Sequence, residues 1–467
     1  MQYFLAIIGG GPAGYTAAEL AAKAGKDVIL FEQNALGGTC LNVGCIPTKS
    51  LLYGAKQYYN ATHAQRYGVT AENVSFDFAT MQKRKTIVVR KLVAGIKQRL
   101  NNEHCTLITG AAKVLPNSGQ TRKRDVNDTI TTRKRDENEC LDQAWQIECN
   151  GETYEAENLL ICTGSTNFVP PIPGIQDNPA VWDSTAALAA TELPASVIIV
   201  GGGVIGLEFA TLYHELGISV TIIEALPRIL ANLDESISDY ITAAYTKRGI
   251  QILTSTKVTA FEGNKVLLDN GETLEAEKIL VSVGRRANLQ GLEALTDLEF
   301  NRGAIVVDDF CRTNLPNVYA AGDVTGKIML AHVASRQAEV AVGRMLKQIP
   351  VQRIAYNAIP SVVYTNPEVA TVGISETALE GCEARTLPMT FSGRFMAENE
   401  GETGLCKLVI NTKSQAVIGV HLVGNPCSEF IAAASFAVRM GYTVPEFRQV
   451  VFPHPTVSEI LHEAING

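Results

Sequence analysis

The 467-residue sequence lacks several features that would assign it to common classes of protein. No apolar run approaches the ~18 residues that a membrane-spanning helix needs, so we expect no membrane partner. The eight cysteines outside positions 40 and 45 show no Cys-x-x-Cys or Cys/His spacing, which excludes the usual zinc and iron–sulfur sites. We therefore expect no metal, and we expect these eight thiols to be reduced and structural.

Positive charge is also scarce. Lys and Arg number 40 against 48 Asp and Glu, a formal charge of −8, which argues against a nucleic-acid partner because phosphate binding needs a positive field. Residues 1–8 have no basic flank and run directly into a glycine turn, so we predict a first β-strand rather than a signal peptide, and a cytoplasmic location. With 46% hydrophobic residues, the chain is long enough for about three domains of a soluble enzyme.

A glycine-rich unit occurs twice. In each copy an apolar run ends in Gly-x-Gly-x-x-Gly, a helix follows, and a second apolar run ends in Glu, 21 residues after the middle glycine. The second copy lies 192 residues after the first. The spacing predicts two Rossmann-like βαβ units, each of which binds a dinucleotide. The residues are Gly9, Gly11, Gly14 and Glu32 in the first copy and Gly201, Gly203, Gly206 and Glu224 in the second.

The positions within each unit have separate tasks. The first glycine makes the tight turn, the second lets backbone approach the pyrophosphate, and the third lets the helix pack closely on the strand. The terminal acid is placed to bind ribose hydroxyls. Glu224 would repel a 2′-phosphate, which arginines normally bind, so the second unit favours NAD over NADP.

Cys40 and Cys45 follow the first unit, within residues 37–49. The pocket at a Rossmann switch point holds a cofactor ring, so a cystine there can exchange electrons with that ring. We predict a redox-active dithiol beside a flavin, with thiol–disulfide exchange coupled to hydride transfer. The first unit would then hold FAD and the second NAD.

The sequence of residues 41–47, Leu-Asn-Val-Gly-Cys-Ile-Pro, resembles the redox motif of the pyridine nucleotide-disulfide oxidoreductases, and among these the dihydrolipoamide dehydrogenases. The resemblance extends over nearly the whole chain. It implies an α/β fold with two Rossmann-like dinucleotide-binding domains and a C-terminal α+β dimerisation domain. The expected ranges are 1–150 for FAD binding, 151–282 for NAD binding, 283–350 for a central segment that completes the FAD site, and 351–467 for the interface domain.

The resemblance also implies residue roles. Cys40 corresponds to the sulfur that exchanges with substrate and Cys45 to the sulfur next to the flavin. Lys49 corresponds to a lysine at the flavin N5 side, paired with a glutamate that maps to Glu208. Contacts to FAD are expected from Gly9, Gly11, Gly14, Glu32, Thr39, Lys49, Ala112, Thr163, Gly164, Asp323, which would bind the ribityl chain, and Ala331, with His332 lining the flavin site. Contacts to NAD are expected from Gly201, Gly203, Gly206, Glu208, Glu224, Val258 and Gly284.

His454 and Glu459 lie near the C-terminus, at a spacing that allows direct contact. Histidine titrates near working pH, and a fixed carboxylate can orient its ring and stabilise its charged form. The resemblance implies a homodimer in which this pair enters the active site of the partner subunit. The prolines on both sides of His454 indicate a rigid turn, which can include a cis bond.

The leading hypothesis is a dihydrolipoamide dehydrogenase that oxidises dihydrolipoyl groups and reduces NAD⁺. The chain shows no lipoyl domain, so the substrate would come from a lipoyl-bearing protein of a 2-oxoacid dehydrogenase or glycine-cleavage complex. One alternative is an NADPH-dependent reductase of glutathione-reductase type, which Glu224 disfavours. Another is a docking subunit of such a complex, although this would not require the two cysteines and His454. The C-terminus has no cysteine pair of the kind found in mercuric and large thioredoxin reductases.

Residues 117–143 depart from the family pattern. Six basic residues here are matched by six acids. We therefore expect a solvated hairpin with salt pairing rather than a nucleic-acid patch.

Overall fold

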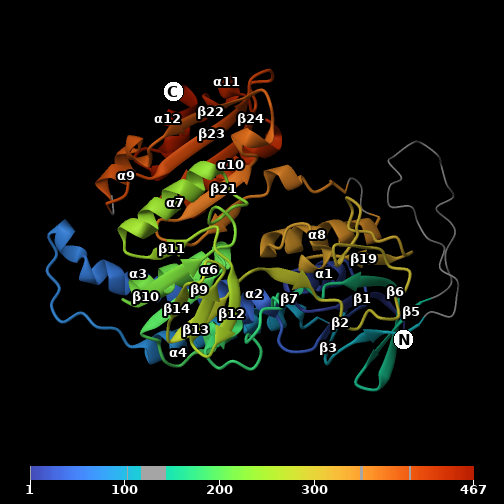
Figure 1. Ribbon diagram of the computed structural model, residues 1–467. Helices are drawn as coiled ribbons and strands as arrows, with labels where there is room; N and C mark the ends of the chain where they lie inside the picture. The colour runs from blue at the N-terminus through green and yellow to red at the C-terminus, as the bar shows by residue number, and fades with distance from the viewer. Residues whose placement is uncertain (1, 103, 117–143, 348–350, 399–400) are drawn as a thin grey trace. The chain divides into compact units, whose positions relative to one another are not determined.

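The computed structural model describes residues 2–102, 104–116, 144–347, 351–398 and 401–467 (Figure 1). The hairpin expected at 117–143 therefore lies outside the described residues. The chain forms two compact units. Unit 1 consists of Met1–Pro47, Lys83–Phe168 and Arg285–Ile354; unit 2 consists of Thr48–Gln82, Val169–Gly284 and Ala355–Gly467.

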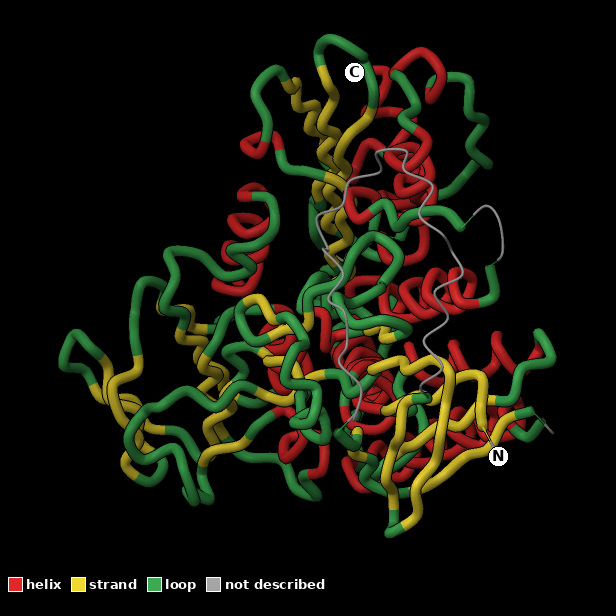
Figure 2. The backbone as a smooth tube through the Cα atoms, turned by 90° about the vertical axis from the view of Figure 1, so that its right-hand side faces the viewer, coloured by secondary structure: helices red, strands yellow, loops and turns green. Residues whose placement is uncertain are grey.

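Unit 1 is built on a seven-stranded sheet in the order β3-β2-β1-β6-β5-β4, with β19 paired to β6. The pairs among β3, β2, β1, β6 and β19 are parallel, whereas β4–β5 and β5–β6 are antiparallel. Figure 2 shows these strands in yellow beside the N-terminus. The strands are β1 (Gln2–Ile8), β2 (Val28–Glu32), β3 (Cys105–Thr109), β4 (Lys113–Val114), β5 (Trp145–Cys149), β6 (Glu152–Ile161) and β19 (Val318–Ala320).

The helix after the first glycine loop is α1, and its buried face consists of small residues. Alanine side chains are short, which allows another helix, α8, to pack closely against it in the same hydrophobic cluster. Thr16 Oγ1 of α1 lies 3.3 Å from Ser335 Oγ of α8. The helices that contribute to unit 1 are α1 (Pro12–Lys23), α2 (Gly38–Val43), most of α4 (Phe78–Leu100) and α8 (Ala331–Met345); short pairs are β7 (Ser165–Asn167) with β16 (Arg285–Ala287) and β17 (Phe300–Asn301) with β18 (Ala304–Ile305).

Unit 2 contains the second glycine loop, on a parallel sheet in the order β11-β10-β9-β15-β8. A three-stranded antiparallel sheet, β12-β13-β14, lies in the same unit. The strands are β8 (Val181–Trp182), β9 (Ser196–Val200), β10 (Ser219–Ile223), β11 (Gln251–Leu253), β12 (Val258–Glu262), β13 (Lys265–Leu268), β14 (Thr273–Glu275) and β15 (Lys278–Val281). The helices are α3 (Cys45–Thr62, nearly all in this unit), α5 (Ser184–Ala189), α6 (Val204–Glu215) and α7 (Glu235–Lys247).

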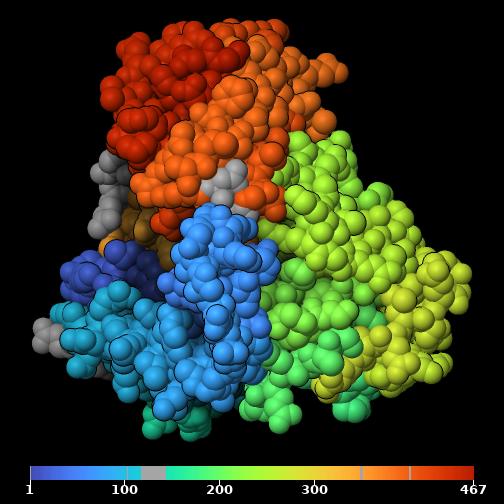
Figure 3. All heavy atoms as spheres, turned by 90° about the vertical axis from the view of Figure 1, so that its left-hand side faces the viewer, coloured from blue at the N-terminus to red at the C-terminus, as the bar shows by residue number. Residues whose placement is uncertain are grey.

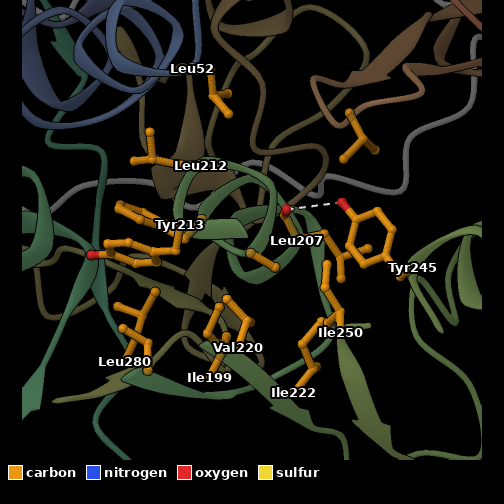
Figure 4. Packing of buried hydrophobic residues seen from close by; sticks show 14 of the residues in the cluster. Leu52, Ile199, Leu207, Leu212, Tyr213, Val220, Ile222, Tyr245, Ile250 and Leu280 are labelled. Carbon is orange, nitrogen blue, oxygen red and sulfur yellow. Dashed lines mark hydrogen bonds between the residues drawn. The ribbon is translucent and has the colours of Figure 1, made fainter. Parts of the chain in front are cut away.

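Helix α6 is surrounded by large apolar residues (Figure 4). Leu207, Leu212 and Tyr213 pack with residues of β9, β10 and β15, and Leu52 of α3 belongs to the same cluster. Tyr245 donates a 3.2 Å hydrogen bond to the Leu207 carbonyl oxygen, so the phenol is satisfied within this core. Full burial of each such side chain contributes on the order of 1.5–3 kcal/mol.

The C-terminal part of unit 2 is an antiparallel sheet in the order β20-β21-β24-β23-β22. Its residues Val363, Val369 and Val423 join the cluster that contains α3 and α6. Figure 3 shows residues of α3 (blue), the second dinucleotide-binding unit (green) and this sheet (orange) on one face of the molecule. The elements are β20 (Ser361–Val363), β21 (Val369–Gly373), β22 (Cys382–Leu387), β23 (Leu405–Asn411), β24 (Val417–Val423), α9 (Gly393–Ala397), α10 (Cys427–Met440), α11 (Val444–Phe447) and α12 (Ile460–Asn466).

The predicted fold class is confirmed: two Rossmann-like sheets and a C-terminal antiparallel sheet with helices. The compact units nevertheless divide the chain differently from the four expected ranges. Strand β6 pairs with β1, so the boundary expected at 150/151 would separate a strand from its own sheet. Residues 48–82 belong to unit 2 although they precede the second repeat. The chain leaves each unit and returns to it, which contiguous ranges cannot describe.

Candidate active site

The first glycine loop has the backbone that its sequence predicts. Gly9 has φ +107°, and a Cβ there would lie 2.2 Å from the Cys162 carbonyl oxygen. A Cβ at Gly14 would lie 1.8 Å from the Gly9 carbonyl oxygen. Both positions therefore require glycine, the first for its positive φ and the second for close packing of helix on loop.

The second glycine loop repeats this geometry. Gly201 has φ +110°, and a Cβ at Gly206 would lie 2.1 Å from the Gly201 carbonyl oxygen. Around Gly203 no heavy atom of the described residues lies within 4 Å of such a Cβ. Gly11 and Gly203 are the N-cap residues of α1 and α6, and neither helix has a side-chain cap. The first-turn amides are thus available for an anion such as a pyrophosphate.

The two strand-end acids are held in the same way. In each copy one carboxylate oxygen accepts a hydrogen bond from an amide of the glycine loop and the other from an amide two residues further along the chain. Each oxygen keeps a second lone pair that can accept a ribose hydroxyl. The donors are Gly10 and Asn34 for Glu32, and Gly202 and Leu226 for Glu224, at 2.7 and 2.8 Å in both copies.

The two cysteines lie at adjoining helix ends. Cys40 is in α2, Cys45 begins α3, and Gly44 separates the helices. A Cβ at Gly44 would lie 2.9 Å from the Thr39 carbonyl oxygen, so this turn is tighter than a side chain at this position permits. Both cysteines are half-buried.

The start of α2 packs directly on the first glycine loop. Gly37 and Gly38 have φ +97° and +57°, and a Cβ at Gly38 would lie 2.7 Å from Gly11 Cα. Asn42 Nδ2 donates to the Leu36 and Gly38 carbonyl oxygens, at 3.0 Å each. Backbone contact and a side-chain clamp thus fix the dithiol segment against the loop that would hold a pyrophosphate.

Tyr15 of α1 belongs to this neighbourhood. Burial raises the pKa of its phenol, and the electrostatic influence of Cys40 and Cys45 raises it further. The hydroxyl therefore stays protonated and can donate a hydrogen bond when the thiols are ionised.

Lys49 and Glu208 are in direct contact. Lys49 Nζ lies 2.8 Å from each oxygen of the Glu208 carboxylate. The Glu208 side chain is 7% exposed and that of Lys49 is 29% exposed. Tyr364 completes the group: its N–H donates to Glu208 Oε1 at 3.2 Å, and its ring centroid lies 4.5 Å from Lys49 Nζ.

Asp323 lies at the end of a polar chain in unit 1. Its Oδ2 accepts a 2.6 Å hydrogen bond from Ser165 Oγ, which accepts a 2.7 Å bond from Arg285 Nε. Arg285 also donates to the Ser165 carbonyl oxygen at 2.8 Å and to the Asn167 side chain. This chain orients the Asp323 carboxylate.

The other residues expected to bind a dinucleotide lie at element ends and loops. Thr163 donates a 2.6 Å hydrogen bond from Oγ1 to the Asn288 carbonyl oxygen. Thr39 lies in α2, and Ala331 and Val258 are the first residues of α8 and β12. A Cβ at Gly291 would lie 2.5 Å from the Ala112 carbonyl oxygen, and Gly164 and Gly284 have φ +70° and +126°. Among the described residues, no cluster of three or more His, Cys, Asp or Glu is arranged for a metal, and no helix is long and apolar enough to cross a membrane.

His454 and Glu459 are also in contact. His454 Nδ1 lies 2.9 Å from Glu459 Oε1, and Glu459 Oε2 accepts a 2.8 Å hydrogen bond from the Thr456 amide. These bonds, the Thr456 amide first, hold the pKa of Glu459 below its usual value. The carboxylate accepts from Nδ1–H, which leaves the Nε2 lone pair of the neutral ring for a proton. The His454 side chain is 79% exposed, and the bond from His454 to Pro455 is cis.

The roles of several residues in this arrangement were not predicted from the sequence. Ser165 and Arg285 are separated by 120 positions, and Tyr364 by 156 from Glu208, so no local spacing could connect them. Asn42 was part of a quoted motif without a role of its own, and Tyr15 lay in a helix known only for its glycines. The one signal that the sequence offered was the amide side chain of Asn42, which lies between the two cysteines.

Comparisons with known proteins were consistent with this geometry. Residues 3–338 match the family described as pyridine nucleotide-disulphide oxidoreductase, and residues 359–465 match its dimerisation domain. Dihydrolipoyl dehydrogenase of Mycoplasma genitalium is 36% identical over 472 residues, covering 99% of this chain and 97% of that protein. Dihydrolipoyl dehydrogenase of Geobacillus stearothermophilus is 35% identical over 471 residues, covering 98% and 94%.

Solved structures are similar over the same length. LpdA from Mycobacterium tuberculosis superposes with a TM-score of 0.87 at 25% identity, covering 99% of both chains. The HOCl-induced flavoprotein disulfide reductase RclA from Escherichia coli has a TM-score of 0.82 at 28% identity, again covering 99% of both. Members of this family use FAD and a pyridine nucleotide, and the dimerisation domain supports a homodimer. The chain belongs to the pyridine nucleotide-disulphide oxidoreductase family.

Proposed function

We propose that this protein is a dihydrolipoyl dehydrogenase that uses FAD and NAD and works as a homodimer. One observation carries most of the argument. Cys40 and Cys45 lie at the adjoining ends of α2 and α3, and α2 begins with Gly38 against Gly11 of the first dinucleotide loop. A dithiol held there is suited to exchange electrons with a cofactor bound to that loop.

The residues fit both cofactors. Each glycine loop has an uncapped helix N-terminus for a pyrophosphate, and Glu32 and Glu224 are oriented for ribose hydroxyls. Asp323, oriented by Ser165, would receive the ribityl chain, with the remaining expected residues around it. Bound FAD would accept an electron pair from the reduced dithiol and pass it to NAD⁺ as a hydride.

The cysteines would perform the exchange with substrate. A dihydrolipoyl thiolate attacks Cys40 Sγ of an oxidised Cys40–Cys45 pair, and Cys45 leaves as a thiolate. The second substrate sulfur then displaces Cys40, which closes the lipoyl disulfide. The substrate loses two electrons and two protons, and the protein dithiol gains the electrons. Net oxidation requires that the pair be reoxidised with NAD⁺ as the final acceptor.

His454 would take the proton from the substrate thiol, because only the thiolate attacks efficiently. Glu459 holds Nδ1 and would stabilise the charged ring. The high exposure of His454 in a single chain supports its action on the partner subunit across the dimer. Thr456 fixes Glu459 through its amide, so the pair is held in one arrangement.

The second glycine loop would bind NAD rather than NADP. Both oxygens of Glu224 face amide donors, which keeps the carboxylate at the ribose position, where a 2′-phosphate would be repelled. The substrate would be a lipoyl group carried by a protein of a 2-oxoacid dehydrogenase or glycine-cleavage complex. The relatives named dihydrolipoyl dehydrogenase support this choice.

A second candidate is a flavoprotein disulfide reductase with a different substrate. It is favoured by the similarity to RclA, at a TM-score of 0.82. Such an enzyme would run in the reverse sense, with NAD(P)H reducing a disulfide.

One assay separates the candidates. Purified protein is tested with NADH and with NADPH, each against lipoamide and glutathione disulfide, and with NAD⁺ against dihydrolipoamide. We expect fast turnover only with NADH and lipoamide or with NAD⁺ and dihydrolipoamide. Turnover of glutathione disulfide with NADPH, without lipoamide activity, would exclude the proposed function.

A further inference from the structure

Tyr364 contacts both members of the Lys49–Glu208 ion pair. It directly follows β20, the first strand of the C-terminal sheet. Its backbone N–H donates to Glu208 Oε1 at 3.2 Å, and its ring centroid lies 4.5 Å from Lys49 Nζ. The residue thus holds the carboxylate through its main chain and the ammonium through its side chain.

The pair needs such support because the Lys49 side chain has more conformational freedom than the Glu208 side chain. Glu208 is buried in the face of α6. Lys49 has a flexible four-carbon stem and is 29% exposed, so water competes for its ammonium group. The face of an aromatic ring attracts a cation, and the Tyr364 ring therefore disfavours positions of Nζ away from Glu208.

We propose that Tyr364 is a positioning residue for hydride transfer, and that the C-terminal sheet sets the geometry of the Lys49–Glu208 pair through it. This inference rests on the proposed function and on the family resemblance, which implies that Lys49 acts at the flavin N5 side, paired with Glu208. It assigns a task in that step to the dimerisation domain, within which Tyr364 falls. The Tyr364 residue is 38% exposed. Its ring is therefore not held over Lys49 simply because it is packed in the core.

Three variants of the flavin-loaded dimer test the proposal. Tyr364→Leu removes the ring but keeps the amide, and Tyr364→Phe keeps the ring. Tyr67→Leu is the matched control, because Tyr67 also has a cation over its ring, Arg66 at 4.9 Å, but lies away from the Lys49–Glu208 pair in the sequence, in the 3₁₀ helix Ala64–Tyr67. The first readout is acylation of Lys49 by acetic anhydride across pH, quantified by mass spectrometry. The second is the rate of flavin reduction by saturating NADH in a stopped-flow instrument.

We expect Lys49 in Tyr364→Leu to be acylated about fivefold faster and its flavin to be reduced about fivefold more slowly, on the scale of a partly exposed cation–π contact. Affinity for NADH should be unchanged. Tyr364→Phe should stay within about twofold of wild type, as should Tyr67→Leu. If Tyr364→Leu unfolds, as thermal melting will show, Tyr364→Met takes its place, because methionine also lacks the ring.

Wild-type acylation and reduction rates in Tyr364→Leu would overturn the proposal. So would equal losses in Tyr364→Phe and Tyr364→Leu, since the hydroxyl rather than the ring would then matter. Failure of the proposed function gives a different result: wild-type protein would lack lipoamide turnover while NADH still reduced its flavin. In that case the acylation pattern still decides the role of Tyr364.

Discussion

The glycine loops of the two dinucleotide-binding units have the same backbone conformation, but the residues that surround them differ. Helix α1 buries alanines, whereas α6 buries large residues such as Leu207 and Tyr213. The fifth residue after the middle glycine shows the difference clearly. In the first unit it is Thr16, which contacts Ser335 of α8; in the second it is Glu208, which binds Lys49.

The loops differ in the same sense. A Cβ at Gly11 would find Gly38 Cα at 3.8 Å, whereas no described atom lies within 4 Å at Gly203. The first loop has a thiol-bearing segment packed on it and the second is open. The repeated motif thus fixes how a phosphate can be bound, and the residues outside it determine the chemistry of each unit.

The largest effect should come from the thiols of the first unit. Cys40→Ser and Cys45→Ser should each lower lipoamide turnover by roughly 10³ or more, because loss of a covalent nucleophile has no substitute. Flavin reduction by NADH should persist, since hydride transfer from NADH to the flavin does not use the thiols. Steady-state and stopped-flow rates measure the two steps separately. Cys105→Ser is the control, because burial raises the pKa of Cys105 to about 11 and keeps it unreactive. If both cysteine variants retained lipoamide turnover, the thiols would not perform the exchange with substrate, and the chemical difference proposed between the two units would be wrong.

The C-terminal dimerisation domain, which contains His454, should contribute to the chemistry of the first dinucleotide-binding unit but not to that of the second. His454→Ala should reduce lipoamide turnover by about 10², the usual contribution of a general base, and leave flavin reduction by NADH intact. The measurement is the ratio of the two rates in the same preparation.

A mixed dimer sharpens this prediction. One subunit carries Cys45→Ser and the other His454→Ala, each with a different tag. If His454 acts in the partner, one complete site remains and about half of wild-type activity returns, by site counting under two-fold symmetry. A mixed dimer as inactive as its parents would place His454 outside the partner's site.

Equivalent glycines should affect different cofactors. Gly14→Ala places a methyl group 1.8 Å from a carbonyl oxygen and should yield protein that loses FAD. Gly206→Ala, at 2.1 Å, should retain FAD but weaken NADH binding by about tenfold or more, as overpacking of 1–3 kcal/mol implies. Flavin absorbance and NADH titration provide the two readouts. Gly95→Ala in α4 meets no described atom within 4 Å and is the control. Loss of FAD from Gly206→Ala with NADH binding intact would reverse the assignment.

The strand-end acids allow a smaller test. Wild-type protein should prefer NADH over NADPH by roughly tenfold, equivalent to ~1.4 kcal/mol. Replacing Glu224 with Ser and exposed Leu226 with Arg should reverse this preference by removing repulsion and adding a phosphate partner. Comparison of kcat/KM for the two nucleotides measures the shift. Glu32→Ser should loosen FAD without altering the preference; a change of preference there would contradict the assignment of the units.

The smallest effect concerns stability of the C-terminal sheet. His421 is buried, its Nε2 donates to the Ile374 carbonyl oxygen at 3.0 Å, and its Nδ1 has no hydrogen-bond partner among the described residues. Burial lowers its pKa, despite Asp234 and Glu376 nearby, and Lys407 lowers it further. The unfolded chain therefore binds more protons below pH ~6.5, and stability should fall as pH decreases through that value. Thermal unfolding at pH 7.5 and 5.5 measures this, and His421→Gln should flatten the dependence. Equal slopes for both proteins would remove His421 as its source.

The sequence predicted those features whose parts lie close together in the chain. The glycines define their turns locally, and the 21-residue interval to Glu32 or Glu224 spans one strand–helix–strand unit. His454 and Glu459 share one turn, so their contact followed from spacing. The Lys49–Glu208 contact came from family resemblance instead.

Features made by distant segments were not predictable in this way. Tyr364 contacts Glu208 because residues of the C-terminal sheet and of α6 pack in one hydrophobic cluster. The sequence gives no periodic pattern that shows which distant elements share a cluster. The pairing of β6 with β1 joins strands that lie more than a hundred residues apart, which no local spacing indicates. Side-chain chains such as Arg285–Ser165–Asp323 require three segments to be placed first.

The contact between Gly11 and Gly38 has a consequence for how this protein can diversify. No side chain separates the dithiol segment from the dinucleotide loop, since a Cβ at Gly38 would lie 2.7 Å from Gly11 Cα. Exchange of side chains therefore cannot lengthen or shorten this spacing by small increments, and any methyl group added at Gly38 displaces backbone. Adaptation to a new redox partner must therefore act through residues other than Gly11 and Gly38, whose contact leaves no space for a side chain.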